Sequence, residues 1–371
     1  MKTDKRIIKE ENDRLKELIP GTRTDDEGNN IEGHNYNLSV SDRGFELSGR
    51  QSLLADKQKT NENPFMVSVW PLVVQEDFKD AFFTSFPGFA NSSNQVVTMS
   101  GSMYHDNVFY KFLEGSASID AFPDILVTTD FNSIYHRPFM DRFLNSRYFE
   151  RIDIHSPSIF TKAGWNHFSS PLKLIASDLL VMVINKSKFL YRGFPREWYE
   201  LLNPSFKGEI IVPDDRDFFC NTFYYYYVKN FGYGAIRQLV SNTCMRAHPQ
   251  NMVKQIEGGN PLEASVFVLP YSYAKDIEDK FGYQIVWPED GAIMIPVQML
   301  VKRGAYEKYK RVVDFLTGPV LGSVLQKHGV VSANAKVFKR FGKTDINWVG
   351  WEFLEAGDLG SIKRKIREHF E

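Results

Sequence analysis

The sequence predicts an α/β protein of two lobes with an N-terminal extension. With 371 residues, the chain is too long for one compact core and fits two domains of about 150 residues each. Strand-like and helix-like segments alternate along residues 66–130 and again along residues 209–269. This alternation is typical of mostly parallel sheets flanked by helices. The first 64 residues are polar and show no such alternation.

The composition excludes two broad classes of protein. Apolar residues make up 43% of the chain and charged residues 25%, which is ordinary for a soluble globular protein. The net charge of -1 argues against a nucleic-acid-binding protein, which normally carries a basic face. No apolar run approaches the roughly 20 residues of a membrane span. Aromatic residues reach 14%, which fits a large core and a cleft lined with flat side chains.

The N-terminal segment, residues 1–18, is charged throughout and has no apolar core, so it does not read as a signal peptide. Neither cysteine lies near it, which leaves no lipoprotein anchor there. Either a cloning methionine replaces a signal, or the protein works in the cytoplasm. The two cysteines, Cys220 and Cys244, lack the spacing of a metal site, and two free buried thiols are favoured over one disulfide.

Residues 1–64 are expected to form an extension that caps the larger body or recruits a partner. Residues 7–18 have the apolar spacing of an amphipathic helix. The acidic stretch 25–30 resembles a calcium loop only superficially, because the alternating ligands and the closing glutamate are missing. A solvated loop is therefore favoured there, and His34 is given no metal role.

The first lobe begins at Phe65. Strands are expected at residues 66–70, 95–99 and 124–128, with helices at 77–86 and 105–113 between them. In open parallel sheets, ligands bind outside the carboxyl ends of the strands. The residues at these three ends are Trp70, the Ser100-Gly101-Ser102 turn, and Thr129-Asp130. Each has another interpretation: Trp70 as core, Ser-Gly-Ser as a plain turn, and Thr-Asp as a helix cap.

A long apolar run at residues 172–185 reads as a strand. Beyond it, Pro195 pre-sets a short helix over 197–202, and Asn203-Pro204 ends that helix. Lys207-Gly208 turns the chain into a compact strand at 209–212.

The second lobe follows, with an aromatic helix over 218–231. Its four consecutive tyrosines, 224–227, cannot share one face, so we expect some to be packed and others exposed. Further helices are expected at 234–241 and 250–257, with a buried strand at 264–269 that ends in Pro270-Tyr271-Ser272-Tyr273. A return strand at 293–301 and a helix at 306–316 follow.

The segment 195–215 resembles the one by which solute-binding proteins of ABC importers pass between lobes. The similarity is to the iron(III)-binding branch of the type 2 periplasmic binding fold, where Pro-x-x-Trp-x-x-Leu-x-x-Pro-x-x-x-Gly-x-Ile recurs. The matching residues are Pro195, Trp198, Leu201 or Leu202, Pro204, Gly208 and Ile210. The resemblance covers roughly residues 65–337, and its last third continues through Pro288-Glu289-Asp290-Gly291, Lys302-Arg303-Gly304 and Gly329-Val330-Val331.

This resemblance implies a domain plan and a function. The plan is an extension at 1–64, lobe 1 at 65–190, lobe 2 at 191–285, and a return to lobe 1 with C-terminal helices at 286–371. The implied function is to close two lobes over a small polar ligand or a metal, ferric iron or its chelate included, and to deliver it to an ABC permease. Such proteins are monomeric carriers, not enzymes, and hold no cofactor. By family, the location is periplasmic or extracellular.

The resemblance also implies a site. Iron-binding members hold the ferric ion with adjacent tyrosines after a strand of the second lobe, whereas here Ser272 separates the pair. A Ser-Gly-Ser turn suits an oxyanion with an arginine as counter-charge, and acidic residues suit a cation or an amine. The predicted ligand-binding residues are Trp70, Ser100, Gly101, Ser102, Thr129, Asp130, Arg216, Asp217, Asn221, Tyr271, Tyr273 and Glu289. Of these, Tyr271 and Tyr273 are the metal ligands if the cargo is iron.

Two rival functions remain open at this point. One is an enzyme on the same fold, although no His-Cys, Ser-His-Asp or paired-carboxylate motif stands out. The histidines are scattered, and His136, His155, His167 and His248 are expected to be structural or exposed. The other is a cytoplasmic ligand sensor or chaperone that contacts a partner through residues 1–64.

Overall fold

The computed structural model describes residues 36–41, 44–49, 64–89, 96–100, 113, 115–153, 156–165, 170–214, 220–277, 280–343 and 345–370. For residues 36–41, 44–49, 97, 99 and 100 only the backbone is described. Strands β1 (Tyr36–Ser41) and β2 (Gly44–Gly49) form a two-stranded sheet of their own. The predicted helix 7–18, the acidic loop 25–30 and His34 lie outside the described residues.

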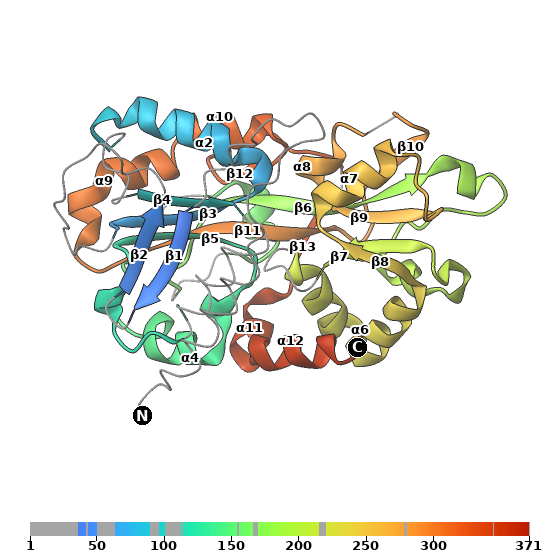
Figure 1. Ribbon diagram of the computed structural model, residues 1–371, viewed down its shortest axis with the longest axis horizontal. Coiled ribbons are helices and arrows are strands. Elements are labelled where there is room, and N and C mark those ends of the chain that lie inside the picture. The colour runs from blue at the N-terminus through green and yellow to red at the C-terminus, as the bar shows by residue number, and fades with distance from the viewer. Residues whose placement is uncertain are drawn as a thin grey trace. The chain divides into compact units, whose positions relative to one another are not determined.

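The body is built on one mixed sheet of 11 strands in the order β4-β3-β5-β11-β6-β9-β7-β8, with β10 and β12 paired to β6 and β13 to β11 (Figure 1). Its strands are β3 (Met66–Trp70), β4 (Val96–Ser100), β5 (Ile125–Thr129), β6 (Lys173–Asn185), β7 (Ile210–Pro213), β8 (Thr243–Ala247), β9 (Val266–Pro270), β10 (Tyr283–Val286), β11 (Ala292–Val301), β12 (Val331–Ser332) and β13 (Ile346–Asn347).

The helices of the body are α2 (Leu72–Ser85), α4 (Arg137–Phe139), α5 (Ser158–Lys162), α6 (Asn221–Asn242), α7 (Pro249–Glu257), α8 (Tyr271–Ala274), α9 (Ala305–Leu316), α10 (Pro319–Lys327), α11 (Gly350–Ala356) and α12 (Leu359–Arg367). Shorter 3-10 turns occur at Pro87–Phe89, Ile119–Ala121, Ser133–Tyr135, Lys186–Phe189, Trp198–Leu202 and Pro204–Phe206, and a π turn at Met140–Leu144. Among the described residues, no helix is both long and apolar enough to cross a lipid bilayer.

Strand β6 runs through both halves of this sheet. Its first half pairs with β11 and β12, and its second half pairs with β9 and β10. The change occurs at Leu180, which is the partner of both Ile293 on β11 and Pro270 on β9. We call the part with β3, β4 and β5 the first lobe, and the part with β7, β8 and β9 the second lobe. The long apolar run 172–185 is therefore the strand that links them.

The first lobe is the predicted parallel unit. Strand β3 pairs in parallel with β4 on one side and with β5 on the other, which confirms the expected parallel pairing. Helix α2 begins at Leu72 rather than at residue 77, because Pro71 ends the strand and serves as its N-cap residue. An aromatic core fixes α2 against α9, with the rings of Phe82 and Phe315 5.6 Å apart.

In the second lobe, β7 runs parallel to β8 and β9. The two helices predicted at 218–231 and 234–241 are assigned as one element, α6, with a break at Gly232 (φ 75°, ψ 179°). Glycine adopts this backbone conformation without steric cost, so the chain turns there without unravelling the helix. Cys220 and Cys244 form no disulfide, as favoured from the sequence, but only Cys220 is buried and Cys244 is half-buried.

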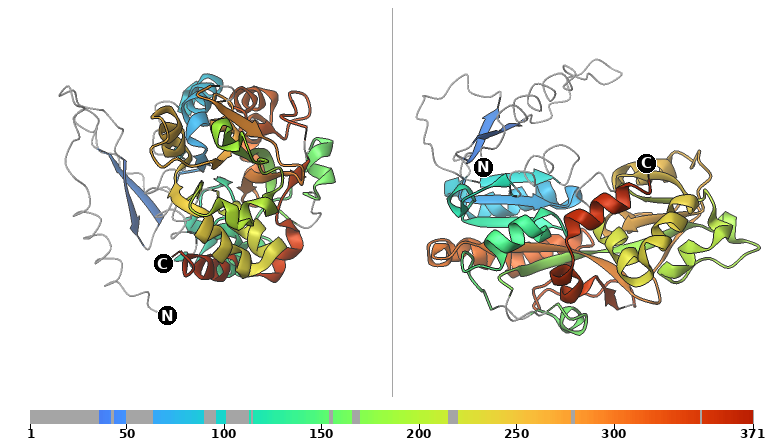
Figure 2. Two further views of the ribbon diagram at one scale, coloured as in Figure 1. Left: turned by 90° about the vertical axis from the view of Figure 1, so that its right-hand side faces the viewer. Right: turned by 90° about the horizontal axis from the view of Figure 1, so that it is seen from below.

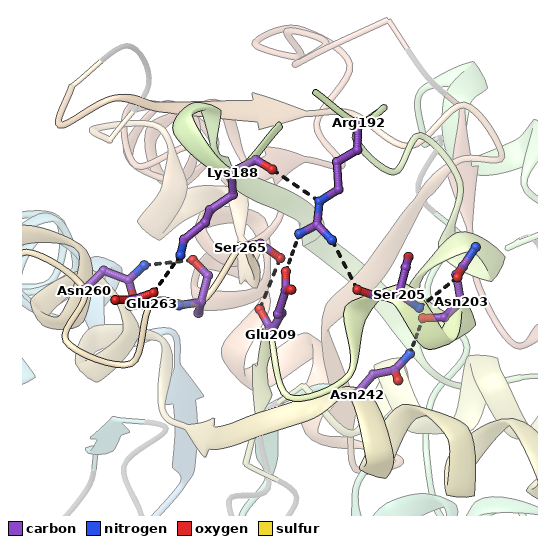
Figure 3. A network of polar contacts seen from close by, with 10 residues as sticks. Lys188, Arg192, Asn203, Ser205, Glu209, Asn242, Asn260, Glu263 and Ser265 are labelled. Atoms are coloured by element: carbon purple, nitrogen blue, oxygen red, sulfur yellow. Dashed lines mark hydrogen bonds and ion pairs between the residues drawn. The ribbon is translucent and has the colours of Figure 1, made fainter. Parts of the chain in front are cut away.

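The crossover segment, residues 186–209, is held on the second lobe by a polar network (Figure 3). The Arg192 guanidinium donates to the carbonyl oxygens of Lys188 (3.2 Å) and Ser205 (3.1 Å) and pairs with the Glu209 carboxylate. The Lys188 ammonium is 2.9 Å from a Glu263 carboxylate oxygen. The predicted short helix is a 3-10 turn at Trp198–Leu202.

The expectation for the four tyrosines of α6 is wrong, because Tyr224, Tyr225, Tyr226 and Tyr227 are all buried. Each of three hydroxyls reaches a different element: Tyr224 donates to Pro213 O, Tyr226 lies 3.3 Å from an Asp290 carboxylate oxygen, and Tyr227 donates to Trp198 O at 2.5 Å. Because β7, the crossover segment and the turn before β11 surround the helix, no side of this turn faces water.

The C-terminal helices contact both lobes, and in Figures 1 and 2 α12 lies between α4 and α6. The guanidinium of Arg137 in the first lobe donates to Glu355 O at 2.6 Å. At the other end, the ring of Phe370 packs edge-on against Tyr224 of α6, with centroids 5.6 Å apart. The segment 350–370 therefore bridges the two lobes.

Candidate functional site

Several predicted site residues fall outside what the structure describes. Gly101, Ser102, Arg216 and Asp217 are among them, and Ser100 is described only as the last backbone position of β4. Their part in the site stays a prediction.

Trp70 lies at the end of β3, where the sequence places it. Its ring stacks on Phe78 in the core of the first lobe, with centroids 4.4 Å apart, and its side chain is fully buried. Within the described part of the chain, its indole N–H has no hydrogen-bond partner. The packing matches the core interpretation, and the free donor leaves its ligand role as a prediction.

The end of β5 forms a rigid polar turn. Asp130 has φ 61°, which is uncommon for a residue with a side chain. Asn132 fixes the turn by donating to Thr129 O and to the Thr128 hydroxyl oxygen, both at 2.5 Å. The Gln298 amide donates to Asp130 O at 3.2 Å. These bonds hold the Asp130 carboxylate at the edge of the first lobe.

Asp130 caps a helix of the other lobe. Its carboxylate oxygens accept from the backbone N–H of Asn221 at 2.5 Å and of Thr222 at 3.2 Å. These residues open α6, whose own N-cap residue, Cys220, makes no capping hydrogen bond with its side chain. A carboxylate at a helix N-terminus satisfies free amide donors and complements the helix dipole. We call these two bonds the interlobe contact.

The residues of the interlobe contact are buried. Asp130 is fully buried, and this burial raises the pKa of its carboxyl to about 6, against the lowering effect of the backbone hydrogen bonds and of the Lys363 ammonium on α12. The hydroxyls of Ser133 and Thr222, both buried, have no hydrogen-bond partner among the described residues. Buried hydroxyls of this kind are costly unless something binds them.

A second buried carboxylate, Asp178, lies in the middle of β6. One oxygen accepts from the N–H of Leu179 at 2.8 Å and of Ser272 at 3.2 Å, and the other accepts from the Ser272 hydroxyl. Burial raises the pKa of this carboxyl to about 6 as well. The sequence signal for this residue was a single acid inside an apolar run. We call these bonds the Asp178 contact.

The Asp178 contact explains the backbone at 271–273. The segment is the helical turn α8, not an extended strand end, because Asp178 binds its second residue. Residues two apart on a helix point in different directions. The ring of Tyr271 accordingly packs on Trp287, whereas Tyr273 packs against His248 and is nearly buried. Burial, with the nearby Asp178 charge, raises the pKa of Tyr273.

Two further observations concern charge and metals. Glu289 is exposed and pairs with Arg196 of the crossover segment at 3.1 Å, and it takes no part in the interlobe contact. In the part of the chain that the structure describes, no group of three or more His, Cys, Asp or Glu side chains is arranged to hold a metal ion. Lys363, by contrast, approaches Asp130 from a C-terminal helix that the sequence had not linked to the site.

Solved structures share this architecture. A ferric ion-binding protein A from Pasteurella haemolytica aligns with a TM-score of 0.59 at 13% identity, over 83% of this chain and 98% of that one. AfuA from Actinobacillus pleuropneumoniae, with fructose-6-phosphate bound, gives 0.58 at 15% identity, over 82% and 97%. Trichodesmium FutA, in complex with iron and citrate ligands, gives 0.58 at 12% identity, over 83% and 99%. These likenesses confirm the two-lobed periplasmic-binding-protein fold.

No curated protein matches the sequence. The family of bacterial extracellular solute-binding proteins matches residues 120–356, which include Asp130, Asp178, the crossover segment and α6. The chain therefore belongs to the bacterial extracellular solute-binding protein family.

Proposed function

We propose that the protein carries a small polar solute by closing its two lobes at the interlobe contact. The observation that carries this proposal is the cap of α6. The first backbone N–H groups of α6 donate to the Asp130 carboxylate of the other lobe, so the contact forms only when the lobes are together. Domain closure around a ligand needs such separable contacts on either side of a hinge.

The ligand class follows from polar groups on residues near the contact in the chain: Thr222, whose N–H binds Asp130, and Ser133, three residues after Asp130. Two buried hydroxyls, on Ser133 and Thr222, have no partner within the described ranges, and a ligand with donors and acceptors would satisfy them. Burial disfavours the phenolate of Tyr273, the form that a bare ferric ion needs. We therefore favour a polar organic solute, with iron carried as a chelate rather than as a bare ion.

Delivery to a membrane permease completes the proposal. Family members bind solutes for ABC importers. We propose that the protein is a carrier rather than an enzyme, with an ABC permease as partner.

A ligand screen tests the proposal. Native mass spectrometry of the purified protein, compared with its denatured mass, would identify any bound solute, and thermal unfolding would follow added ferric citrate, fructose 6-phosphate, thiamine and spermidine. A ligand at 100 times its Kd stabilises the folded state by about 2.7 kcal/mol. We expect one compound to do so in the wild type and at least tenfold less tightly in Asp130→Asn. Equal binding by both proteins would place the ligand elsewhere.

A further inference from the structure

A cavity of about 550 Å³ lies in the first lobe, and neither Asp130 nor any residue of α6 lines it. Its described lining comes from Tyr135, the π turn at Met140–Leu144, residues 145–147 and 149–151, Ser170 and Pro171 shortly before β6, the turn after β11, and α11. Cavities of roughly 300 to 1,000 Å³ are the size that small organic ligands occupy.

Three arginines stand at the rim of this cavity: Arg147, Arg151 and Arg303. The backbone places them. Glu150 N donates to Val301 O at 2.7 Å and Arg303 N to Tyr148 O at 2.8 Å, and a bridge between Phe149 and Lys302 fixes this stretch beside the end of β11. Arg147 lies in the turn 145–148 just before the buried Phe149 and Arg151 lies two residues after it, and all three line the cavity.

The three arginines at this rim carry positive charge that the carboxylates of the cavity do not fully balance. Over the ranges that the structure describes, none of the three guanidiniums makes a hydrogen bond or an ion pair. Two carboxylates, Glu150 and Glu355, also line the cavity, and one oxygen of Glu150 already accepts from Gly304 N at 2.8 Å. Three forked donors outnumber the two acids, which favours an anion at the rim.

The floor of the cavity is apolar and aromatic. Phe149, Leu144 and Leu354 are buried there, and Trp351 is held by its indole N–H, which donates to Trp165 O at 2.9 Å. A flat apolar group would replace water on this floor at a gain of about 25 cal/mol per Å² of apolar surface. An apolar floor beneath a rim of arginines selects for a molecule with one apolar end and one anionic end.

We propose that this cavity is a second binding site, for a small organic anion whose carboxylate or phosphate is held by Arg147, Arg151 and Arg303 and whose flat apolar part lies on Phe149 and Trp351. Two hydrogen bonds link the lining of this site to Asp130 of the interlobe contact. Tyr135 at its floor donates to Gln298 Oε1 at 2.6 Å, and the same amide donates to Asp130 O at 3.2 Å. An occupant would therefore lie two hydrogen bonds from the interlobe contact without touching Asp130 or α6.

The test uses the full chain and two aromatic anions, phenyl phosphate and benzoate, with neutral benzamide as the matched control. Binding is followed by isothermal titration calorimetry and by fluorescence, because Trp351 lies in the site. We expect saturable binding of at least one anion, weaker at high salt, and at least tenfold weaker binding of benzamide. The tighter of the two anions identifies the head group. Equal binding of benzamide would overturn the proposal, as would the absence of any anion binding.

Variants distinguish binding at this site from nonspecific binding of the anion elsewhere on the surface. Arg147→Gln with Arg303→Gln removes two exposed guanidiniums without disturbing the core, and should weaken anion binding roughly tenfold. Arg237→Gln, an exposed arginine of α6 that likewise makes no bond among the described residues, should leave it unchanged. Asp130→Asn should also retain anion binding, so a failed cleft proposal would leave this one standing. Unchanged affinity in the double variant would contradict the site.

Discussion

Asp130 and Asp178 have nearly the same local chemistry, but they bind to different parts of the molecule. Both are fully buried, both accept hydrogen bonds at the start of a helix, and burial raises both carboxyl pKa values to about 6. Their partners differ. Ser272 follows β9, which is hydrogen-bonded to the strand that carries Asp178. The partners of Asp130, Asn221 and Thr222, belong to a helix of the other lobe.

This difference assigns the two carboxylates different roles. The Asp178 contact lies within one continuous sheet, so it persists whether the lobes are open or closed, and its loss affects folding. The interlobe contact breaks when the lobes separate, so its loss affects the balance between open and closed forms. Four variants or conditions sharpen this comparison.

The largest expected effect is on global stability. Asp178→Ala leaves the N–H of Leu179 and both donors of Ser272 without their acceptor, which should lower the free energy of unfolding by about 2 to 3 kcal/mol. Urea unfolding at pH 5 measures this, because the carboxyl is then largely neutral and the cost of burying a charge does not mask the lost bonds. A loss below about 0.5 kcal/mol would show that the contact is not structural.

The next effect is the pH dependence of stability. A folded-state pKa of about 6 for Asp178, above the ordinary 3.8, means that the folded protein keeps a proton that the unfolded chain has lost. Its stabilising contribution is therefore complete below about pH 4 and is lost as the pH rises through 6, by about 2 to 3 kcal/mol. Asp178→Asn should remove about half of the fall seen in urea titrations of the wild type between pH 4 and 7, because Asp130, whose pKa is also raised to about 6, contributes the rest. The exposed Asp276→Asn, the control, should keep it.

A smaller effect is expected from Lys363, which distinguishes the two acids. The ammonium of this buried lysine favours the charged form of Asp130 and has no such effect on Asp178. Lys363→Met should therefore raise the pKa of Asp130 further, by less than about one pKa unit, and leave that of Asp178 in place. Infrared difference spectra of the carboxyl groups across pH 4 to 8 can follow both. A change of equal size at both sites would contradict the assignment.

The sequence was informative where a local rule applies. Alternating strands and helices predicted the parallel pairing of β3 with β4 and β5, and the rule of strand ends pointed to Asp130. The resemblance at 195–215 led to the family that the comparisons confirm. Asp178 stands as an acid inside the apolar run 172–185, and it was not among the residues predicted for the site.

Other features depend on distant parts of the chain and had no local signal. Nothing near Asp130 indicates that its partners are Asn221 and Thr222, or that Lys363 of a charged terminal helix approaches it. The tyrosines of α6 were expected to be partly exposed, because helical periodicity assumes a solvent-facing side. Tertiary cover from three other elements removes that side.

The most direct test of the comparison is a distance between the lobes. Spin labels at the exposed residues Asp80 on α2 and Glu257 on α7, in a Cys244→Ser background, report closure by double electron–electron resonance and are insensitive to residues 1–63. We predict that Asp130→Ala, which removes both acceptors of the interlobe contact, lengthens this distance or broadens its distribution relative to the wild type, whereas Asp178→Asn leaves it unchanged. Identical distributions for wild type and Asp130→Ala would contradict the role given to the interlobe contact.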